Sequence, residues 1–210
     1  MAPLSVGGGS GDRVETVEGG TMTKEPESAT RAALAALTAT TDDDAVAAAV
    51  ARARGEITTG VTGRPGAGKS TLVRALSDRV SGPLLELHGV DAPDLPDPRL
   101  DVDVLLHVIA RGFTDADRAV LTARRSAPTL VVVGRPDLAI GGPEKCDAVR
   151  AEDAEAVVGW WTAACATARR RRDLALCAEL ETVAAARPAT RAAVETFLRD
   201  PAIAAVRGAS

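Results

Sequence analysis

The sequence predicts an α/β fold, in which a mainly parallel sheet is flanked by helices and followed by a C-terminal helical extension. Short, continuously apolar runs alternate with segments whose apolar residues recur at helical spacing. This alternation is typical of parallel strands covered by helices on both faces. Beyond residue 142 the pattern is helical throughout. The 210 residues, of which 46% are hydrophobic but only 2% aromatic, suffice for one domain of ordinary size built by close packing of small side chains.

The first part of the chain predicts a tail and two helices. Residues 1–28 are rich in Gly, Ser, Thr and acidic side chains, which bury too little apolar area to offset the entropy of ordering, so we expect a disordered tail. A helix is predicted over 31–37 and a second over 41–54. In the second, Thr41 and Asp44 have the spacing of a capping box.

The middle of the chain predicts the sheet. Four apolar runs are bounded by turn residues, and two intervening segments have apolar residues at helical spacing. The later of these two helices opens with Thr114 and Asp117, which again form a capping-box pair. The predicted strands are 56–62, 84–90, 102–110 and 129–133, and the predicted helices are 69–80 and 114–125.

The last part of the chain predicts three helices, over 151–168, 169–186 and 188–198. Pro188 suits a first helical position. The run Arg169 to Arg172 fits a solvated helix turn or a phosphate- or lipid-binding patch. The resulting division is a tail (1–28), a core (29–142) and a C-terminal helical segment packed on that core (143–210).

Charge and hydropathy exclude several classes of protein. A net charge of −4 and a pI of about 5.3 argue against a protein that coats nucleic acid, which needs a basic face. No apolar run is long enough for a membrane span, and the first residues lack a signal-peptide pattern. We therefore expect a cytoplasmic protein. Cys146, Cys165 and Cys177 lack metal-type spacing and are expected to be reduced packing residues.

One motif carries specific chemistry. The segment GRPGAGKS fits G-x-x-x-x-G-K-[ST] at every position, directly after a predicted strand and at the start of a predicted helix. Such a loop turns backbone N–H groups and the positive end of a helix dipole toward an anion. We therefore expect the P-loop NTPase fold and a nucleotide-binding site, and Thr71 could add a phosphate contact. The motif residues are Gly63, Arg64, Pro65, Gly66, Ala67, Gly68, Lys69 and Ser70.

The same motif predicts a magnesium site. Lys69 is expected to neutralise the β- and γ-phosphate oxygens, and the Ser70 hydroxyl is expected to ligate Mg²⁺. A bound magnesium ion also needs an acidic partner at the tip of a neighbouring strand. We expect Asp91 in that role, because it ends the apolar run LLELHGV. The alternative is that Asp91 caps a turn in a Pro-rich loop.

From about Arg31 to Leu138 the order of these pieces resembles the GTPase domain of the Ras-like and translation-factor class, and within it dynamin-like proteins. The stretch DAPD (91–94) is similar to the Asp-x-x-Gly element of that family, and TLVVVGRPD (129–137) to the strand that ends in Asn-Lys-x-Asp. The resemblance implies that Asp137 accepts hydrogen bonds from guanine and that Arg135 stacks over the base. It also implies nucleotide-dependent dimerisation.

The departures from the family pattern have chemical consequences. Asp94 stands in place of a glycine whose N–H meets the γ-phosphate, and Gly134 stands in place of the base-binding asparagine. Asp91 follows Lys69 by only 22 residues, which leaves no room for a switch I segment with its magnesium-binding threonine. Hydrolysis is therefore expected to be slow. Arg64 is either an arginine finger supplied in cis or a solvent-facing loop residue.

Three functions remain open at this level. The first is a Mg²⁺-dependent protein that binds a purine nucleotide, GTP more readily than ATP, as a weak or regulatory GTPase. Its protein partner, or a second copy, would dock on the C-terminal helices, where Trp160 and Trp161 either anchor a partner or pack on the sheet. The second is a small ATP-dependent nucleotide or metabolite kinase, whose phosphate-gripping arginines would come from the Arg169 to Arg172 run. The third is a degenerate P-loop scaffold.

Overall fold

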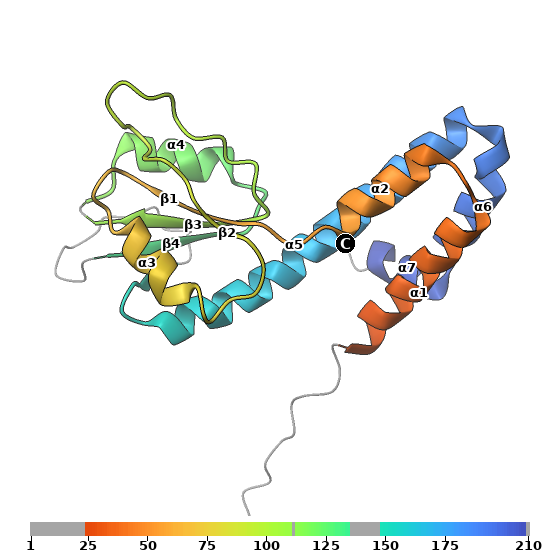
Figure 1. Cartoon of the computed structure of the whole chain (residues 1–210), viewed down its shortest axis with the longest axis horizontal. Coiled ribbons are helices and arrows are strands. Elements are labelled where there is room, and N and C mark those ends of the chain that lie inside the picture. The colour runs from red at the N-terminus through yellow and green to blue at the C-terminus, as the bar shows by residue number, and fades with distance from the viewer. Residues whose placement is uncertain (1–23, 111, 135–147, 209–210) are drawn as a thin grey trace, which may run out of the picture.

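The computed structural model describes residues 24–110, 112–134 and 148–208. It contains a sheet with its flanking helices and a separate group of helices, and the long helix α5 runs through both (Figure 1). The elements are α1 (Lys24–Thr40), α2 (Asp44–Arg54), β1 (Thr59–Gly63), α3 (Lys69–Leu76), β2 (Leu84–Glu86), β3 (Val104–Ile109), α4 (Asp115–Ala123), β4 (Thr129–Val133), β5 (Ala148–Arg150), α5 (Ala154–Ala186), α6 (Pro188–Leu198) and α7 (Pro201–Gly208).

The expected α/β architecture with a parallel sheet is confirmed. The sheet has the order β2-β1-β3-β4-β5, and each neighbouring pair is parallel. In this order the chain first moves outward from β1 to β2 and then crosses to the other side of β1 for β3, β4 and β5. The direction of winding therefore reverses between β1 and β3, and open α/β sheets bind their ligands in the crevice at the carboxyl ends of such strands.

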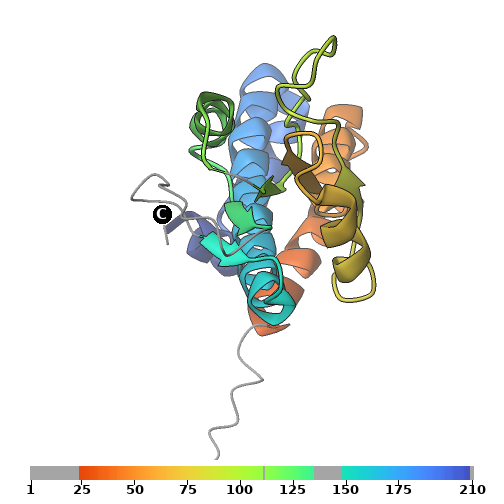
Figure 2. The same cartoon turned by 90° about the vertical axis from the view of Figure 1, so that its left-hand side faces the viewer.

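Helices cover both faces of the sheet. On one face α3 and the first half of α5 pack on the strands, with Leu72, Leu106 and Val157 in a shared core. On the other face α4 packs through Val120 against Leu105. Figure 2 shows α3 and α4 on opposite sides. Continuously apolar strands are the sequence consequence of this double cover, and all six residues of β3 are buried.

A second core lies away from the sheet. It joins α1 and α2 to the second half of α5, α6 and α7, and we call these helices the helical body; the sheet, α3, α4 and the first half of α5 form the sheet body. The largest apolar residues of this second core are Leu34, Leu37, Val46, Leu176, Leu180, Val194, Phe197 and Ile203.

The helical body differs from the predicted division of the chain. Helix α1 begins at Lys24, inside the segment expected to be a tail. Helices α1 and α2, expected within the core 29–142, pack on the C-terminal helices instead, and only the first half of α5 contacts the sheet. The C-terminal helices thus complete a bundle with the N-terminal ones.

Asp43 connects the two ends of the described chain. It is the N-cap of α2, where Thr41 was predicted, and its side chain accepts the N–H of Ala45. The same carboxylate accepts hydrogen bonds from Arg187 at 2.5 Å and from the Thr190 hydroxyl at 2.8 Å. These hydrogen bonds from Arg187 and Thr190 lower the pKa of Asp43 to about 2.

The two bodies meet at an arginine clamp. Arg172 of α5 binds the Asp103 carboxylate through two nitrogens, at 2.8 and 2.6 Å, and also donates to the carbonyl oxygens of Gly55 and Glu56. Arg169 donates to the carbonyl of Gly55 as well. Asp103 precedes β3, so these arginines lie at the amino edge of the sheet, opposite the carboxyl ends of the strands.

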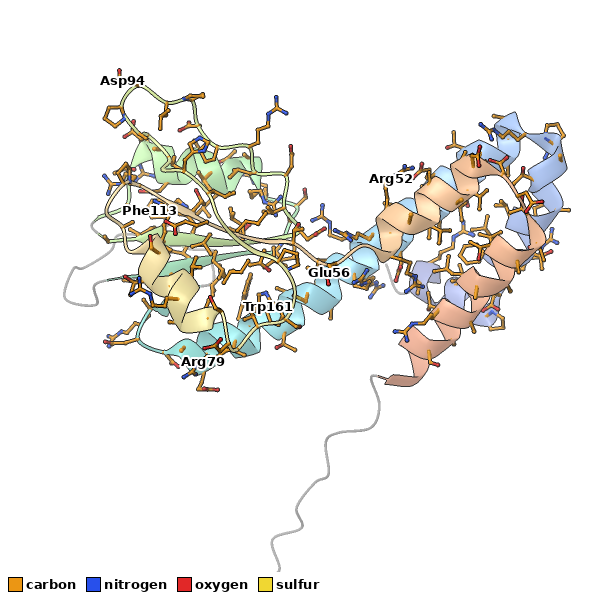
Figure 3. The ribbon with its side chains drawn as sticks, viewed as in Figure 1. Arg52, Glu56, Arg79, Asp94, Phe113 and Trp161 are labelled. Carbon is orange, nitrogen blue, oxygen red and sulfur yellow. The ribbon has the colours of Figure 1, made fainter. Side chains whose placement is uncertain are left out.

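Other predicted elements differ from the structure in their bounds. The predicted helices 151–168 and 169–186 form one continuous helix, α5. The predicted strand 84–90 is a regular strand only over Leu84–Glu86, after which Leu87 and Val90 still donate their N–H groups to carbonyls of β1. Trp161 packs on the sheet and donates its indole N–H to the Thr59 hydroxyl at 2.9 Å, as Figure 3 shows between α5 and the strands. Within the described ranges, none of the helices is long and apolar enough to cross a membrane.

Candidate functional site

The glycine-rich loop, residues 63–70, connects β1 to α3 at the point where the winding of the sheet reverses. Gly63 has φ +144°, and a Cβ at this position would lie 2.3 Å from the carbonyl oxygen of Val108. Gly66 and Gly68 also have positive φ, at +74° and +99°. Residues without a Cβ are therefore required for the chain to leave β1 this close to β3 and then turn sharply into α3.

The side chain of Lys69 lies inside this loop. It is only 8% exposed, and its ammonium donates to the carbonyl oxygens of Gly63 and Arg64, both at 3.2 Å. A buried ammonium needs such partners because its desolvation is costly. The loop therefore holds a positive charge beside the first turn of α3, where backbone N–H groups also point outward.

Ser70 has a carboxylate partner that the sequence analysis did not predict. Its exposed hydroxyl donates to Oε1 of Glu86 at 2.8 Å. Glu86 is the last residue of β2 and pairs in register with Val61 of β1. Since β2 runs parallel to β1, the end of β2 must lie beside the loop that follows β1. A predicted strand ending at residue 86, rather than at residue 90, would have placed Glu86 beside the loop by this rule.

Asp91, the predicted acidic partner of magnesium, lies at the same edge of the sheet. The N–H of Val90 donates to the carbonyl of Gly63 at 3.2 Å, which places the next residue beside the loop. Asp91 itself has φ +55°, and its N–H donates to Oδ1 of Asp97 at 3.0 Å. Within the described residues no hydrogen bond joins Asp91 to Ser70, so Glu86 is the carboxylate in contact.

The ends of three other strands close around the loop. Gly89 packs on Pro65 so tightly that a Cβ there would lie 2.8 Å from the proline Cδ, and a Cβ at Gly134 would lie 3.1 Å from the carbonyl of Ala67. Arg64 reaches across to the carbonyl of Gly112 at 3.3 Å. Gly134 thus stands where a larger side chain, such as the asparagine of the resembled family, would press on the loop.

Asp94 lies away from the loop. It has φ +63° and is exposed, and Figure 3 shows it at the outer tip of the segment between β2 and β3, pointing away from α3. The carboxylate of Asp94 is therefore directed toward solvent rather than toward the glycine-rich loop. Thr71 is exposed in the first turn of α3. Arg135 and Asp137 lie outside the described residues.

A buried polar network anchors the helix that follows β3. His107 of β3 and Asp117 of α4 are almost wholly buried, and Nε2 of His107 lies 2.8 Å from Oδ1 of Asp117. The second carboxylate oxygen accepts the N–H and the hydroxyl of Thr114, which confirms the predicted capping box. Burial raises the pKa of Asp117, but the hydrogen bonds from His107 and Thr114 outweigh it and bring the pKa to about 2.

The loop and its neighbours present the kinds of groups that bind anions and hard cations in proteins. The loop provides a buried ammonium and backbone N–H groups, and Ser70 with Glu86 provides oxygen atoms of the kind that Mg²⁺ prefers. Among described residues no cluster of three or more His, Cys, Asp or Glu could hold a metal alone. Magnesium in such sites is held by one or two protein oxygens together with water and phosphate.

Cys165 and Cys177 are free thiols within the described chain. Burial raises the pKa of Cys165 to about 11 and also raises the pKa of Cys177, so both remain protonated and serve as packing residues.

In comparisons with known proteins, no family model and no curated protein sequence matched this chain.

Proposed function

We propose that the protein binds a purine nucleoside triphosphate together with Mg²⁺, GTP in preference to ATP. The observation that carries this proposal is the position of the glycine-rich loop, which leaves β1 where the strand order reverses and contains the buried Lys69 ammonium. The loop would bind the β- and γ-phosphates through its backbone N–H groups and through Lys69.

Binding would require two exchanges of hydrogen-bond partners. Lys69 would turn from the carbonyls of Gly63 and Arg64 toward phosphate oxygens, where its charge is better compensated. Ser70 would turn its hydroxyl from Glu86 to the metal ion. The Glu86 carboxylate would then accept hydrogen bonds from magnesium-bound water, with Asp91 as the competing candidate for the same role.

The guanine preference rests on the resemblance of TLVVVGRPD to the base-binding strand of GTPases. Asp137 would accept the N1 and N2 hydrogens of guanine, which adenine cannot supply in the same pattern. Arg135 would stack on the base. Gly134 cannot contribute the asparagine hydrogen bond, which would reduce base discrimination by about 1–3 kcal/mol relative to a complete motif.

Hydrolysis would be slow, so the protein would act as a weak or regulatory GTPase. Residues 77–83 connect α3 directly to β2, which supports the inference that a magnesium-binding switch I segment is missing. Arg64 could stabilise transition-state charge only after releasing the Gly112 carbonyl. The kinase alternative has less support, because Arg169 and Arg172, two of the four arginines that it would use, bind groups at the opposite edge of the sheet.

The first test is competition binding with fluorescent guanine and adenine nucleotides, with and without Mg²⁺. We expect Lys69→Ala to abolish binding and Arg74→Ala, an exposed substitution on the same helix, to leave it unchanged. Asp137→Ala should remove the guanine preference. Binding that survives Lys69→Ala would overturn the proposal and leave the scaffold hypothesis, and better binding of adenine would favour the kinase.

The second test separates the two candidate carboxylates. Glu86→Gln keeps the shape of the side chain but removes its charge, so we expect the Mg²⁺-dependent part of nucleotide affinity to fall by about tenfold. Affinity without Mg²⁺ should stay the same. Asp91→Asn is the matched variant, and a loss confined to Asp91→Asn would assign the metal role to that residue instead.

A further inference from the structure

An open groove lies between α4 and α5 at the amino edge of the sheet. It has a volume of about 1050 Å³ and is bounded by the last turn of α4, the segment joining α4 to β4, and one face of α5. Strand β5 pairs with β4 only from Val131 onward, so within the described chain the start of β4 has no strand on its outer side. The groove lies at the opposite edge of the sheet from the glycine-rich loop, so an inference about it does not depend on the proposed function.

The rim of the groove is basic. Arg118, Arg124 and Arg125 line it, and Arg171 lies one helical turn beyond Thr167, the last lining residue on α5. Arg125 and Arg171 are exposed, and neither forms an ion pair with another residue that the structure describes. This concentration of cations contrasts with the net charge of −4 for the whole chain and creates a local positive potential.

Carboxylates near the groove compensate Arg118 and Arg124 but form no ion pair with Arg125 or Arg171 among the described residues. Asp115 pairs with Arg118, whose guanidinium also lies over the ring of Phe113, with 5.7 Å to its centroid. Asp103 is bound by Arg172. Arg124 is held in place by the carbonyl oxygens of Leu100 and Asp103, so it presents a fixed charge rather than a mobile one.

The walls of the groove are apolar. Leu121 and Pro128 form one side, and Trp160, Ala163 and Ala164 of α5 form the other. Trp160 is half-buried and packs against the core cluster that contains Val104 and Trp161. Protein interfaces are enriched in Trp and Arg at their energetic centres, because such side chains combine apolar area with charge-assisted hydrogen bonding.

We propose that this groove docks a short acidic segment of a partner protein. Carboxylates of the segment face Arg125 and Arg171, and its apolar side chains contact Trp160 and Leu121. Charge complementarity selects this occupant, since an apolar segment would leave the arginines without partners and a basic one would be repelled.

The test uses a synthetic amphipathic peptide of Glu, Leu and Ala, labelled for fluorescence anisotropy, and a second peptide with Lys in place of every Glu. The full chain is used. We expect only the acidic peptide to bind, with an affinity that falls as salt is added. The chain contains no tyrosine and two tryptophans, so binding should also change the fluorescence of Trp160.

Matched charge reversals locate the binding surface. The double variant Arg125→Glu and Arg171→Glu should lower the affinity for the acidic peptide by roughly tenfold or more. The control, Arg74→Glu and Arg99→Glu, makes the same change in net charge at exposed positions outside the groove and should leave the affinity unchanged.

Four results would overturn the proposal. The acidic peptide could fail to bind the unmodified chain, both peptides could bind equally, or the control variant could lose as much affinity as the groove variant. The fourth is that the chain binds a uridine-rich RNA but not the acidic peptide, and that the groove variant binds this RNA less tightly. Such a result would assign the arginines to nucleic-acid binding.

Discussion

At the scale of single residues, Gly63 determines how the glycine-rich loop leaves the sheet. Its positive φ and its contact with the Val108 carbonyl leave no space for a Cβ. Gly66 also has a positive φ, but nothing lies within 4 Å of the position that its Cβ would occupy. Alanine substitutions at these two positions can therefore be compared. At Gly63 the loss of stability includes a steric clash, whereas at Gly66 it comes from the backbone conformation alone.

We expect Gly63→Ala to destabilise the protein by about 3 kcal/mol or more, because the clash adds to the conformational strain. Gly66→Ala should cost only about 1–2 kcal/mol, the price of a left-handed conformation. Urea unfolding of the two variants, followed by circular dichroism, measures the difference. Equal losses would mean that β1 can move away from β3 without cost.

The residues of the candidate site could be predicted unevenly from the sequence. The loop from Gly63 to Ser70 was found because its chemistry depends on adjacent residues. Glu86 was missed because it lies inside the apolar run LLELHGV, and its contact with Ser70 arises only from the parallel pairing of two strands. Local patterns do not contain such contacts between segments.

At the scale of elements, the network of His107, Asp117 and Thr114 fixes α4 on β3. Because Asp117 is ionised at neutral pH and a carboxylate can only accept, Nε2–H of His107 must donate to it. The pKa of Asp117 is about 2 in the folded protein and near 3.8 when the chain is unfolded. A carboxyl with a lowered pKa stabilises the fold above its unfolded pKa, and this stabilisation is lost as the pH falls toward 2.

We expect Asp117→Asn to reduce stability at neutral pH and to flatten the fall in stability between pH 4 and pH 2, roughly the interval bounded by the two pKa values. Asp115→Asn, at an exposed position of the same helix, should keep the steep dependence. Chemical unfolding at a series of pH values provides the comparison. An unchanged slope in Asp117→Asn would assign acid sensitivity to Asp43 or Asp103, whose pKa values are also lowered.

Of the five strands that the structure describes, four were predicted, three of them with misplaced ends. Strand β5 (Ala148–Arg150) was missed, because the pattern beyond residue 142 was interpreted as helical throughout. The strand 129–133 and the helix 188–198 match the structure because apolar runs and prolines define them locally. Strand β2 ends at Glu86, and the residues that follow it contact the glycine-rich loop, with Gly89 packed against Pro65. The helix predicted as two pieces is continuous in the structure, and Arg169 and Arg172, at the predicted break, are helical residues that bind the segment joining α2 to β1.

At the scale of the whole molecule, the pair of Arg172 and Asp103 joins the two bodies. Both side chains are mostly buried, with 22% and 16% exposed. Asp103 also accepts hydrogen bonds from the N–H and hydroxyl of Thr58, just before β1. One carboxylate thus fixes α5, β1 and β3 relative to one another.

We expect Arg172→Ala to lower the free energy of unfolding by about 2–4 kcal/mol, because Asp103 would keep a poorly compensated charge. Arg171→Ala, at the neighbouring exposed position, should change stability by less than about 0.5 kcal/mol. Limited proteolysis should in addition cut Arg172→Ala faster near residues 55–58. Equal proteolysis of the two variants would show that packing alone holds the bodies together.

The grouping of α1 and α2 with the C-terminal helices was beyond sequence patterns, because it depends on contacts such as that between Asp43 and Thr190, 147 residues apart. Apolar periodicity shows that each helix has a face to bury, but not which segment buries it.

This grouping has a consequence during synthesis. The sheet body interrupts a helical bundle, so Leu34 and Val46 emerge from the ribosome long before Leu176 and Val194, which cover them. At ordinary translation rates the delay is on the order of 10 s, far longer than helix formation or collapse takes. The nascent N-terminal helices thus present uncovered apolar faces while the sheet folds behind them, which is the condition that chaperones recognise and that favours aggregation or exchange of helices between neighbouring chains.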